Sequence, residues 1–390
     1  MLDRALSALN RRRPELLALT ERWVNVNSHS RNVAGVDQVG DLICEALRAL
    51  PLEVHRQPGA PWGQHLCFSS AASERLPAVL LIGHHDTVFP PGTFEGFRAD
   101  GARAYGPGVL DMKGGLAIVA VVLRVLHELG VLEAFPLRFV SVADEEVGSP
   151  TSRSWLEALA RGARAALVFE AGRSADAIVT SRRGSGFAIV RAVGRAAHAG
   201  NHLADGRNAV WALARFVDRV QQRGSDLAGG SVSTGLFRGG SARNTVAETA
   251  EAELDLRFVD AQTQRTVEQL LQTTAGEVER ELEGVKLEVK ATISRRPLEA
   301  SPASSRLCER FGGFQRAAGL ASGEAPRQGG GSDANTVGAL GLPVIDGLGP
   351  RGRGYHTHDE QIEIDSLALK AEALLRFLLA EFDQTQSEAE

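Results

Sequence analysis

The sequence predicts an α/β protein in which one domain, with a mixed and largely parallel sheet, is interrupted by a smaller inserted α+β domain. Three patterns along the 390 residues support this prediction. Apolar runs of strand length alternate with helix-length runs over residues 1–183, the order β-α-β-β-α-β follows over 184–296, and the alternation returns over 297–390. Strands that alternate with helices form largely parallel sheets, and the order in the middle is that of a ferredoxin-like domain.

The elements of the first segment follow from short apolar runs bounded by polar residues. Residues 78–83 (AVLLIG), 137–143 (LRFVSVA) and 165–169 (AALVF) are largely apolar and of strand length, which is typical of strands buried on both faces. Residues 115–130 form a helix-length apolar run that ends at a glycine, as helices often do. A second helix is expected near 153–160, which completes the alternation.

The inserted segment and the segment after it show the remaining expected elements. Residues 246–258 contain the clearest alternation, AETAEAELDLRF, which favours a strand with one buried face. In chain order the insertion is expected to contain strand 186–193, helix 207–222, strands 231–238 and 246–258, helix 262–282 and strand 286–293. Beyond the insertion, helices are expected at 304–318 and 365–382.

The composition is that of a soluble globular protein, with 43% hydrophobic and 23% charged residues. A formal net charge of -5 argues against a nucleic acid or an anionic membrane as partner. Cys44, Cys67 and Cys308 are far apart and odd in number, so no disulfide framework is expected. The N-terminus reads as an amphipathic helix rather than a secretory signal, and the apolar stretch 116–129 is too short to span a bilayer, which together predict a cytoplasmic protein.

Polar side chains follow three of the expected buried strands. In chain order they are His84, His85 and Asp86 after the first strand, Asp144, Glu145 and Glu146 after the second, and Glu170 after the third. Ligands of open α/β sheets bind beyond the carboxyl ends of the strands, so these groups are expected to meet at one edge. The loop GPGVLDMKGG adds Asp111, and the motif GYHTHDE adds His356 and His358.

Imidazole and carboxylate groups without thiolates suit zinc or a similar first-row metal. Two metals that share a carboxylate are a known route to a strong nucleophile at neutral pH, and a general base must then stand beside the attacking water. The adjacent pair Glu145 and Glu146 can divide the tasks of base and ligand, since consecutive side chains at a strand end point different ways.

Each of these motifs also has an ordinary structural interpretation. A lone surface histidine such as His84 is most often inert, and an Asp-Glu-Glu run is most often a solvated acidic turn. Gly106 and Gly108 suggest a dinucleotide-binding loop, but their spacing misses GxGxxG and no strand immediately precedes them. The joint placement of the motifs favours the metal site.

The motifs also form one ordered set. In chain order they are GHHDTVFP, YGPGVLDMKGG, ADEEVGS, VFEAG, GRAAHAG, GGSARN, RQGGGSDAN and GYHTHDE. From about residue 80 to about residue 365 the chain resembles the M20 family of metallopeptidases, and most closely its carboxypeptidase G2-like (glutamate carboxypeptidase) branch. The resemblance implies a di-zinc exopeptidase-type catalytic domain with an inserted ferredoxin-like lid or dimerisation domain.

The resemblance also implies a role for each group at the sheet edge. The zinc ligands would be His84 and Glu170 for one ion, Glu146 and His356 for the other, and Asp111 as the bridge between them. Glu145 would be the general base that activates the water, and Asp86 would orient His84 as a carboxylate behind a metal-bound imidazole. Family members carry a cis peptide after the bridging aspartate, which here is the bond Asp111–Met112.

Four further residues match family positions that act on substrate. His198 would help to stabilise the oxyanion, often in the active site of the other subunit of a dimer, so a homodimer through the inserted domain is expected. Asn244 and Arg257 match positions on the same domain, and Arg327 would lie near the substrate carboxylate, which a guanidinium can bind with two hydrogen bonds. For Arg257 and Arg327 an ordinary surface role stays open.

Two departures from the family pattern leave the ligand assignment open. His85 stands between His84 and Asp86, where the family usually has an apolar residue, and it offers an alternative ligand. His358 follows His356 by two residues and could compete for the metal. His356 is favoured because it follows Gly354 and Tyr355, as in the family motif.

The expected activity is hydrolysis of an amide bond next to a free carboxylate, in a small peptide or an N-acyl amino acid, with two Zn²⁺ ions or with Co²⁺ or Mn²⁺ in their place. A rival enzyme is an N-acyl-amino-acid deacylase of the aminoacylase or acetylornithine deacetylase type, which would share every ligand. A rival of another class is a catalytically silent metal-binding scaffold. The presence of Glu145 argues against that second rival.

Overall fold

The computed structural model describes residues 1–389 and divides into two compact units. The first unit comprises Met1–Ser181, Ala300–Arg327 and the chain from Ser332 onward. The second comprises Arg182–Glu299 together with Gln328–Gly331. None of the helices in the described chain combines the length and the apolar character needed to cross a bilayer.

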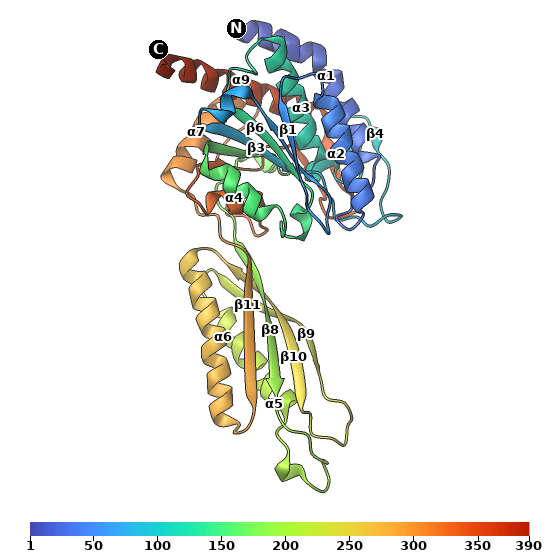
Figure 1. The fold of residues 1–390 in the computed structure, drawn as a ribbon, viewed down its shortest axis with the longest axis vertical. Helices are drawn as coiled ribbons and strands as arrows, with labels where there is room; N and C mark the ends of the chain where they lie inside the picture. The colour runs from blue at the N-terminus through green and yellow to red at the C-terminus, as the bar shows by residue number, and fades with distance from the viewer. Residues whose placement is uncertain (390) are drawn as a thin grey trace. The chain divides into compact units, whose positions relative to one another are not determined.

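The first unit is built around a six-stranded mixed sheet (Figure 1). Its strands, in spatial order, are β1 (Glu53–Gln57), β2 (His65–Ser69), β6 (Leu137–Val142), β3 (Ala78–His84), β7 (Ala163–Val168) and β12 (Val344–Ile345). The pairs β6–β3, β3–β7 and β7–β12 are parallel, whereas β1–β2 and β2–β6 are antiparallel. The predicted α/β class with a mixed, largely parallel sheet is confirmed.

Helices cover both faces of this sheet, which is why β3 is buried at every residue. The helices of the unit are α1 (Leu2–Val24), α2 (Val33–Leu47), α3 (Gly114–Glu128), α4 (Arg153–Arg161), α7 (Pro302–Ala317), α8 (Asp333–Gly338) and α9 (Ile364–Ala389). Figure 1 shows α2 and α3 on one side of the sheet and α4 on the other. The central helix α3 is buried along nearly its whole length and packs against α1 and α9. Its apolar sequence therefore forms core on all sides.

A small antiparallel sheet lies at the periphery of the first unit. Its strands, in spatial order, are β13 (Gly352–Arg353), β14 (Gln361–Glu363), β5 (Arg103–Tyr105) and β4 (Arg98–Asp100). It joins the segment after GYHTHDE to the segment before GPGVLDMKGG, because Gln361 pairs with Tyr105 and Ile362 with Ala104. Two motifs that are far apart in sequence are thereby brought together.

The second unit is a four-stranded antiparallel sheet with two helices. In chain order its elements are β8 (Gly184–Val193), α5 (Ala209–Ser225), β9 (Gly230–Gly239), β10 (Thr249–Phe258), α6 (Ala261–Glu281) and β11 (Lys286–Arg295). The spatial order β11-β8-β10-β9 is that of a ferredoxin-like fold, as predicted. Alternate residues of β8 and β10 are buried beneath α5 and α6, in a core that includes Phe216, Leu254 and Phe258.

Candidate metal centre

Imidazole and carboxylate groups of the first unit gather where strands β3, β6 and β7 end. His84 is the last residue of β3, Glu145 begins a 3₁₀ turn just after β6, and Glu170 follows β7 by two residues. These three strands are parallel neighbours, so their carboxyl ends lie at the same edge of the sheet. Asp111 comes to this edge from the kinked segment Val109–Lys113, in the loop GPGVLDMKGG that the sequence suggested, and the backbone of Asp111 itself is not helical (φ −120°, ψ 89°).

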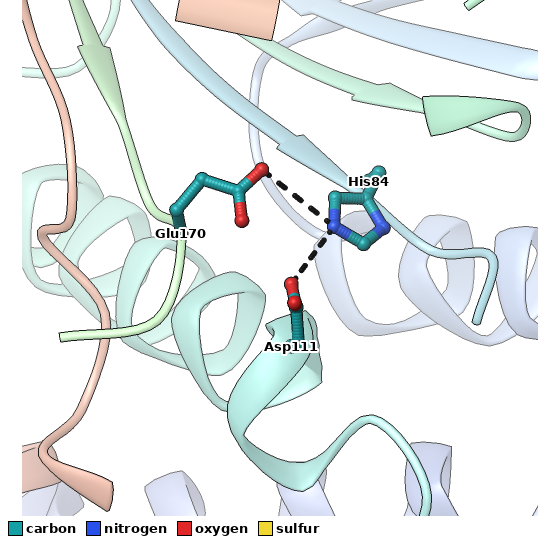
Figure 2. A group of neighbouring side chains, drawn as sticks. All are labelled: His84, Asp111 and Glu170. Carbon is teal, nitrogen blue, oxygen red and sulfur yellow. Dashed lines mark hydrogen bonds and ion pairs between the residues drawn. The ribbon is translucent and has the colours of Figure 1, made fainter. Parts of the chain in front are cut away.

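One cluster is formed by His84, Asp111 and Glu170 (Figure 2). Nε2 of His84 lies 3.2 Å from Oδ1 of Asp111 and 3.7 Å from Oε1 of Glu170. All three side chains are buried or nearly so, with His84 only 1% exposed. The peptide bond after the aspartate, Asp111–Met112, is cis, as the family resemblance implied.

A second cluster uses the other oxygen of the same aspartate. Nε2 of His356 lies 3.5 Å from Oδ2 of Asp111 and 3.2 Å from Oε2 of Glu146. The His356 side chain is 49% exposed, and its ring meets that of Tyr355 edge-on, with ring centres 5.6 Å apart. The Arg173 guanidinium lies over the other ring of this pair, 5.7 Å from the centre of Tyr355. The half-exposed histidine is thus held by an edge-on ring contact rather than by burial.

The spacing of the donor atoms fits a divalent metal ion in each cluster. The donor atoms of each cluster lie within 4.8 Å of one another. Two ligands bound at about 2.1 Å to a tetrahedral zinc ion lie about 3.4 Å apart. The four distances from the two imidazole nitrogens to their carboxylate oxygens, 3.2, 3.7, 3.5 and 3.2 Å, scatter around that value. The clusters therefore suit two ions that share Asp111.

The electrostatics of the site also favour cations. Burial raises the pKa of Glu170 well above its usual range, and the nearby charge of Asp111 raises it further. Hydrogen bonds from His356 to Asp111 and Glu146 raise the pKa of that imidazole to about 11. Burial thus penalises the charge of Glu170, and neighbouring carboxylates favour a cation at His356; a divalent ion would offset the first and supply the second.

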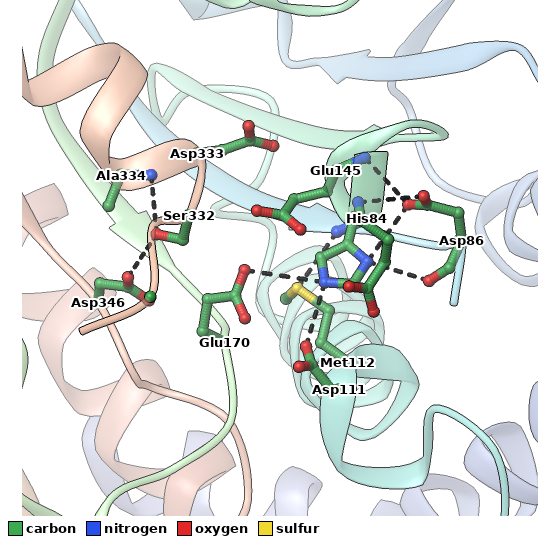
Figure 3. Close-up of polar contacts among 12 residues, drawn as sticks. His84, Asp86, Asp111, Met112, Glu145, Glu170, Ser332, Asp333, Ala334 and Asp346 are labelled. Atoms are coloured by element: carbon green, nitrogen blue, oxygen red, sulfur yellow. Dashed lines mark hydrogen bonds and ion pairs between the residues drawn. The ribbon is translucent and has the colours of Figure 1, made fainter. Parts of the chain in front are cut away.

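Asp86 supports the centre from behind. Nδ1 of His84 lies 3.1 Å from the backbone carbonyl oxygen of Asp86 and 3.4 Å from its carboxylate. The same carboxylate accepts hydrogen bonds from Ser30 Oγ at 2.7 Å and from the backbone N–H groups of Glu145 and Glu146, both at 3.2 Å. Asp86 is fully buried. It therefore holds both the His84 ring and the turn that carries Glu145 and Glu146, as Figure 3 shows in part.

The side chain of Glu145 points into the space between the ligands. Figure 3 shows its carboxylate directed towards the carboxylate of Glu170 and the ring of His84. Glu145 is 9% exposed and carries a charge that acts on both of those residues. Glu146, the next residue, instead faces His356. The two adjacent glutamates thus point different ways, which lets one bind a metal and leaves the other near it.

The structure places the two alternative histidines away from the clusters. His85 points to the opposite side of β3 from His84, where its Nδ1 lies 2.9 Å from Ser141 Oγ, and burial lowers its pKa to about 3. His358 packs against the ring of Phe94, with ring centres 5.5 Å apart. Among the described residues, neither belongs to a group with metal-ligand spacing.

The four residues expected to act on substrate lie outside these clusters. His198 and Asn244 are exposed neighbours in the second unit, joined by a hydrogen bond from Ala199 N to the Asn244 carbonyl oxygen at 2.9 Å. Arg257, on β10, makes a two-point ion pair with Asp255 at 2.8 and 2.9 Å. Arg327 is exposed at the end of a segment of the first unit. Their roles towards substrate stay predictions.

Sequence reasoning missed two polar groups that support the ligands. Ser30 donates to Asp86, and the fully buried Glu360 accepts hydrogen bonds from the backbone of the turn that carries Asp111. Glu360 lies within the motif GYHTHDE, so its position in the sequence indicated a role near the site. No motif near Ser30 indicated a role for that residue.

Comparisons with known proteins agree with this arrangement. A model of peptidase family M20/M25/M40 matches residues 80–380. Carboxypeptidase G2 of Pseudomonas sp. (strain RS-16) is 26% identical over 372 residues, which cover 94% of this chain and 89% of the relative. Acetylornithine deacetylase of Myxococcus xanthus is 27% identical over 322 residues, which cover 78% of this chain and 80% of that protein.

The fold comparison points the same way. A solved structure of a dinuclear metal-binding peptidase from the M20 family, from Bacillus subtilis, superposes with a TM-score of 0.71 at 13% identity and covers 96% of this chain and 99% of its own. The resemblance read from the motifs is confirmed. The chain belongs to peptidase family M20/M25/M40 and is a metallohydrolase of the peptidase and amidohydrolase type.

Proposed function

We propose that the protein is a di-zinc exopeptidase that cuts an amide bond next to a free carboxylate, as a glutamate carboxypeptidase does. The observation that carries the proposal is the shared carboxylate of Asp111. Its two oxygens lie 3.2 and 3.5 Å from two different imidazoles, and each imidazole has a glutamate as its other neighbour. Co²⁺ or Mn²⁺ would fit the same donors as Zn²⁺.

The residues divide the chemistry as follows. Two divalent ions bound here would polarise the scissile carbonyl and acidify the attacking water. Glu145 accepts the proton of that water and passes it to the leaving amine, because its carboxylate points into the site without taking part in either cluster. Asp86 keeps the backbone N–H groups of Glu145 and Glu146 in place throughout, so base and ligand hold their separate orientations.

The identity of the substrate is supported by the relatives and by the cationic residues. Similarity to carboxypeptidase G2 favours substrates with a free C-terminal carboxylate. We assign Arg327 to that carboxylate, and Asn244 and Arg257 to the rest of the substrate. His198 would donate to the oxyanion of the tetrahedral intermediate. Residues 1–183 and 297–390 would form the catalytic domain and 184–296 a lid.

A homodimer through the inserted unit is part of the proposal. Trp211 on α5 and Leu236 and Phe237 on β9 are 53%, 51% and 44% exposed, which is high for large apolar side chains. Strand β9 also lies at the edge of its sheet, where unpaired backbone groups are available to a second chain. A single particle of monomer mass in light scattering, over the micromolar range, would contradict the dimer.

The second candidate is an N-acyl-amino-acid deacylase. It is favoured by the similarity to acetylornithine deacetylase, which covers most of this chain. Such an enzyme would use the same ligands and the same Glu145, and only the groups that contact the acyl chain would differ. The two candidates therefore separate by substrate and not by any property of the metal centre.

A substrate panel with matched variants tests the proposal. The zinc-loaded protein would be offered N-acetyl, N-benzoyl and dipeptide forms of glutamate, aspartate and neutral amino acids. Glu145→Gln should abolish turnover while two metal ions stay bound, whereas Glu21→Gln, an exposed glutamate on α1, should behave like the unchanged protein.

The outcomes are distinct. Release of acidic C-terminal residues supports the carboxypeptidase, and release only from small-acyl substrates selects the deacylase. No turnover of any substrate with two ions bound would refute both.

A further inference from the structure

Glu360 is a buried carboxylate that the proposed mechanism does not use. It is 0% exposed and lies four residues after His356 in the chain. Its Oε1 accepts hydrogen bonds from Leu110 N at 2.8 Å and Asp111 N at 2.9 Å, and its Oε2 accepts one from Gly108 N at 3.1 Å. Three backbone donors on a single carboxyl group form a directional set of hydrogen bonds.

These bonds fix the turn that carries the shared ligand. The backbone of this turn is not regularly helical at Asp111, and Glu360 provides acceptors across the fold for three of its N–H groups. The set includes the backbone N–H of Asp111 itself. A shift of Glu360 would therefore move the Asp111 backbone directly.

Glu360 also closes the turn that directly follows the one carrying His356. Thr357 N donates to the Gly354 carbonyl oxygen at 3.0 Å, and Glu360 N donates to that of Thr357 at 3.2 Å. His356 has a positive φ of 63° within the first of these turns, which few non-glycine residues adopt. The backbone of Glu360 is anchored as well, because its carbonyl oxygen accepts from Gly106 N at 3.4 Å.

One residue thus connects the segments of two ligands that lie 245 positions apart in sequence (356 − 111). His84, Glu146 and Glu170, by contrast, are placed by the ends of sheet strands or by the turn that Asp86 holds. The cluster of Asp111, Glu146 and His356 therefore depends on Glu360 for two of its three ligands. The cluster of His84, Asp111 and Glu170 depends on it for one.

We propose that Glu360 is a positioning residue that sets the separation of Asp111 and His356 and thereby the affinity of the more exposed of the two metal sites. The proposal rests on the two-metal function proposed above. A residue that only stabilised the fold would instead leave the ratio of the two metal affinities unchanged.

The test compares Glu360→Gln with Glu363→Gln. Glutamine keeps the shape of Glu360 but presents an NH₂ group to at least one backbone donor. Glu363 lies three residues further on, is exposed, and serves as the matched control. Both variants would be titrated with Zn²⁺ against a chromophoric chelator, and the Co²⁺-loaded proteins compared by visible absorption. The expected result for Glu360→Gln is about 10–100-fold weaker binding of the second ion, with the first ion affected less and the spectrum of one Co²⁺ changed.

Two results would overturn the inference. One is a variant that binds both ions as the unchanged protein does. The other is one that loses affinity equally at both sites while melting lower in the metal-free form, which is the signature of a general structural role. If the glutamine variant does not fold by circular dichroism, Glu360→Asp, which keeps the charge on a shorter side chain, takes its place under the same criteria. Failure of the unchanged protein to bind two ions would refute the proposed function instead, so the two failures are distinguishable.

Discussion

Replacing Asp86 with asparagine tests how the proposed metal centre is assembled, because this one carboxylate supports both His84, a proposed ligand, and Glu145, the proposed general base. Oδ1 serves Glu145 N at 3.2 Å and His84 Nδ1 at 3.4 Å, and Oδ2 serves Ser30 Oγ at 2.7 Å and Glu146 N at 3.2 Å. Asparagine has the same shape, but an NH₂ group takes the place of one oxygen. If the NH₂ group replaces Oδ1, Glu145 N loses its acceptor, whereas His84 Nδ1 keeps the Asp86 carbonyl oxygen at 3.1 Å. If it replaces Oδ2, Glu146 N loses its acceptor, whereas the Ser30 hydroxyl can turn and accept.

The magnitude follows from those contacts. One buried backbone donor is left without an acceptor in either orientation, at a cost of about 1–3 kcal/mol, so the free energy of unfolding of the metal-free protein should fall by about that amount. Loss of a partner behind a metal-bound imidazole typically weakens metal binding or activity by about 10–100-fold, and that loss should appear at the site that contains His84. Because the Glu145 turn is released as well, kcat should fall even when the metal concentration saturates both sites.

Urea unfolding of the metal-free protein and chelator competition measure the two effects separately. Asp226→Asn, at an exposed aspartate that caps the end of α5, provides the control. The reasoning fails if Asp86→Asn unfolds at the same urea concentration as this control and binds zinc equally well. It also fails in part if metal binding weakens but kcat at saturating metal is unchanged, because Asp86 would then not position Glu145.

Three further predictions concern protons, ligands and a buried lysine. The pKa of His356 is raised to about 11 by its carboxylate neighbours, so metal binding near pH 7 should release a proton and become tighter as the pH rises. Calorimetry in buffers of different ionisation enthalpy measures that proton. If no proton is released, the assignment of His356 as a metal ligand is contradicted. Metal analysis should find two bound ions per chain in the His358→Ala variant but only one in the His356→Ala variant. Burial lowers the pKa of Lys370 from 10.5 to about 8 despite Asp176, so the unfolded chain binds more protons between these pH values. Stability should then rise by about 3 kcal/mol from pH 8 to 10.5 in urea unfolding, and Lys370→Met should lack the rise.

The buried strands and the ligands at their ends were predictable because their signal is local. A short apolar run such as residues 78–83 is typical of a buried strand in a globular chain, and the structure has β3 over Ala78–His84. The helix expected at 115–130 is α3, Gly114–Glu128. Polar residues directly after such strands can only lie at the carboxyl edge of the sheet, so His84 and Glu170 met as expected.

Elements without an apolar signal escaped the sequence reading. Strand β1, Glu53–Gln57, has the sequence EVHRQ and is almost wholly exposed, so neither alternation nor an apolar run marks it. The strands of the small sheet are two or three residues long, which is too short to show a repeated alternation of apolar and polar residues. They form because the rest of the fold brings their segments together, and such tertiary contacts produce no pattern in the local sequence.

The support behind the ligands was hidden for a related reason. A hydrogen bond from Leu110 N to Glu360 joins residues 250 positions apart, and one from Ser30 to Asp86 joins residues 56 apart. The residue types did not indicate burial, since glutamate and serine are mostly exposed in folded proteins. Only the fold shows that both are fully or almost fully buried.

The order of the proposed ligands along the chain would link metal binding to the completion of the first unit. Four proposed ligands, from His84 to Glu170, precede the second unit in the chain, and His356 follows it. Without the last segment, the cluster of Asp111 and Glu146 has only two protein ligands, and the turn around Asp111 also lacks the acceptors that Glu360 provides. Since a metal ion stabilises only the state that binds it, the second ion selects chains in which this C-terminal segment has docked. A metal ion bound at the more exposed site, that of Asp111, Glu146 and His356, would therefore indicate that the first unit has folded completely.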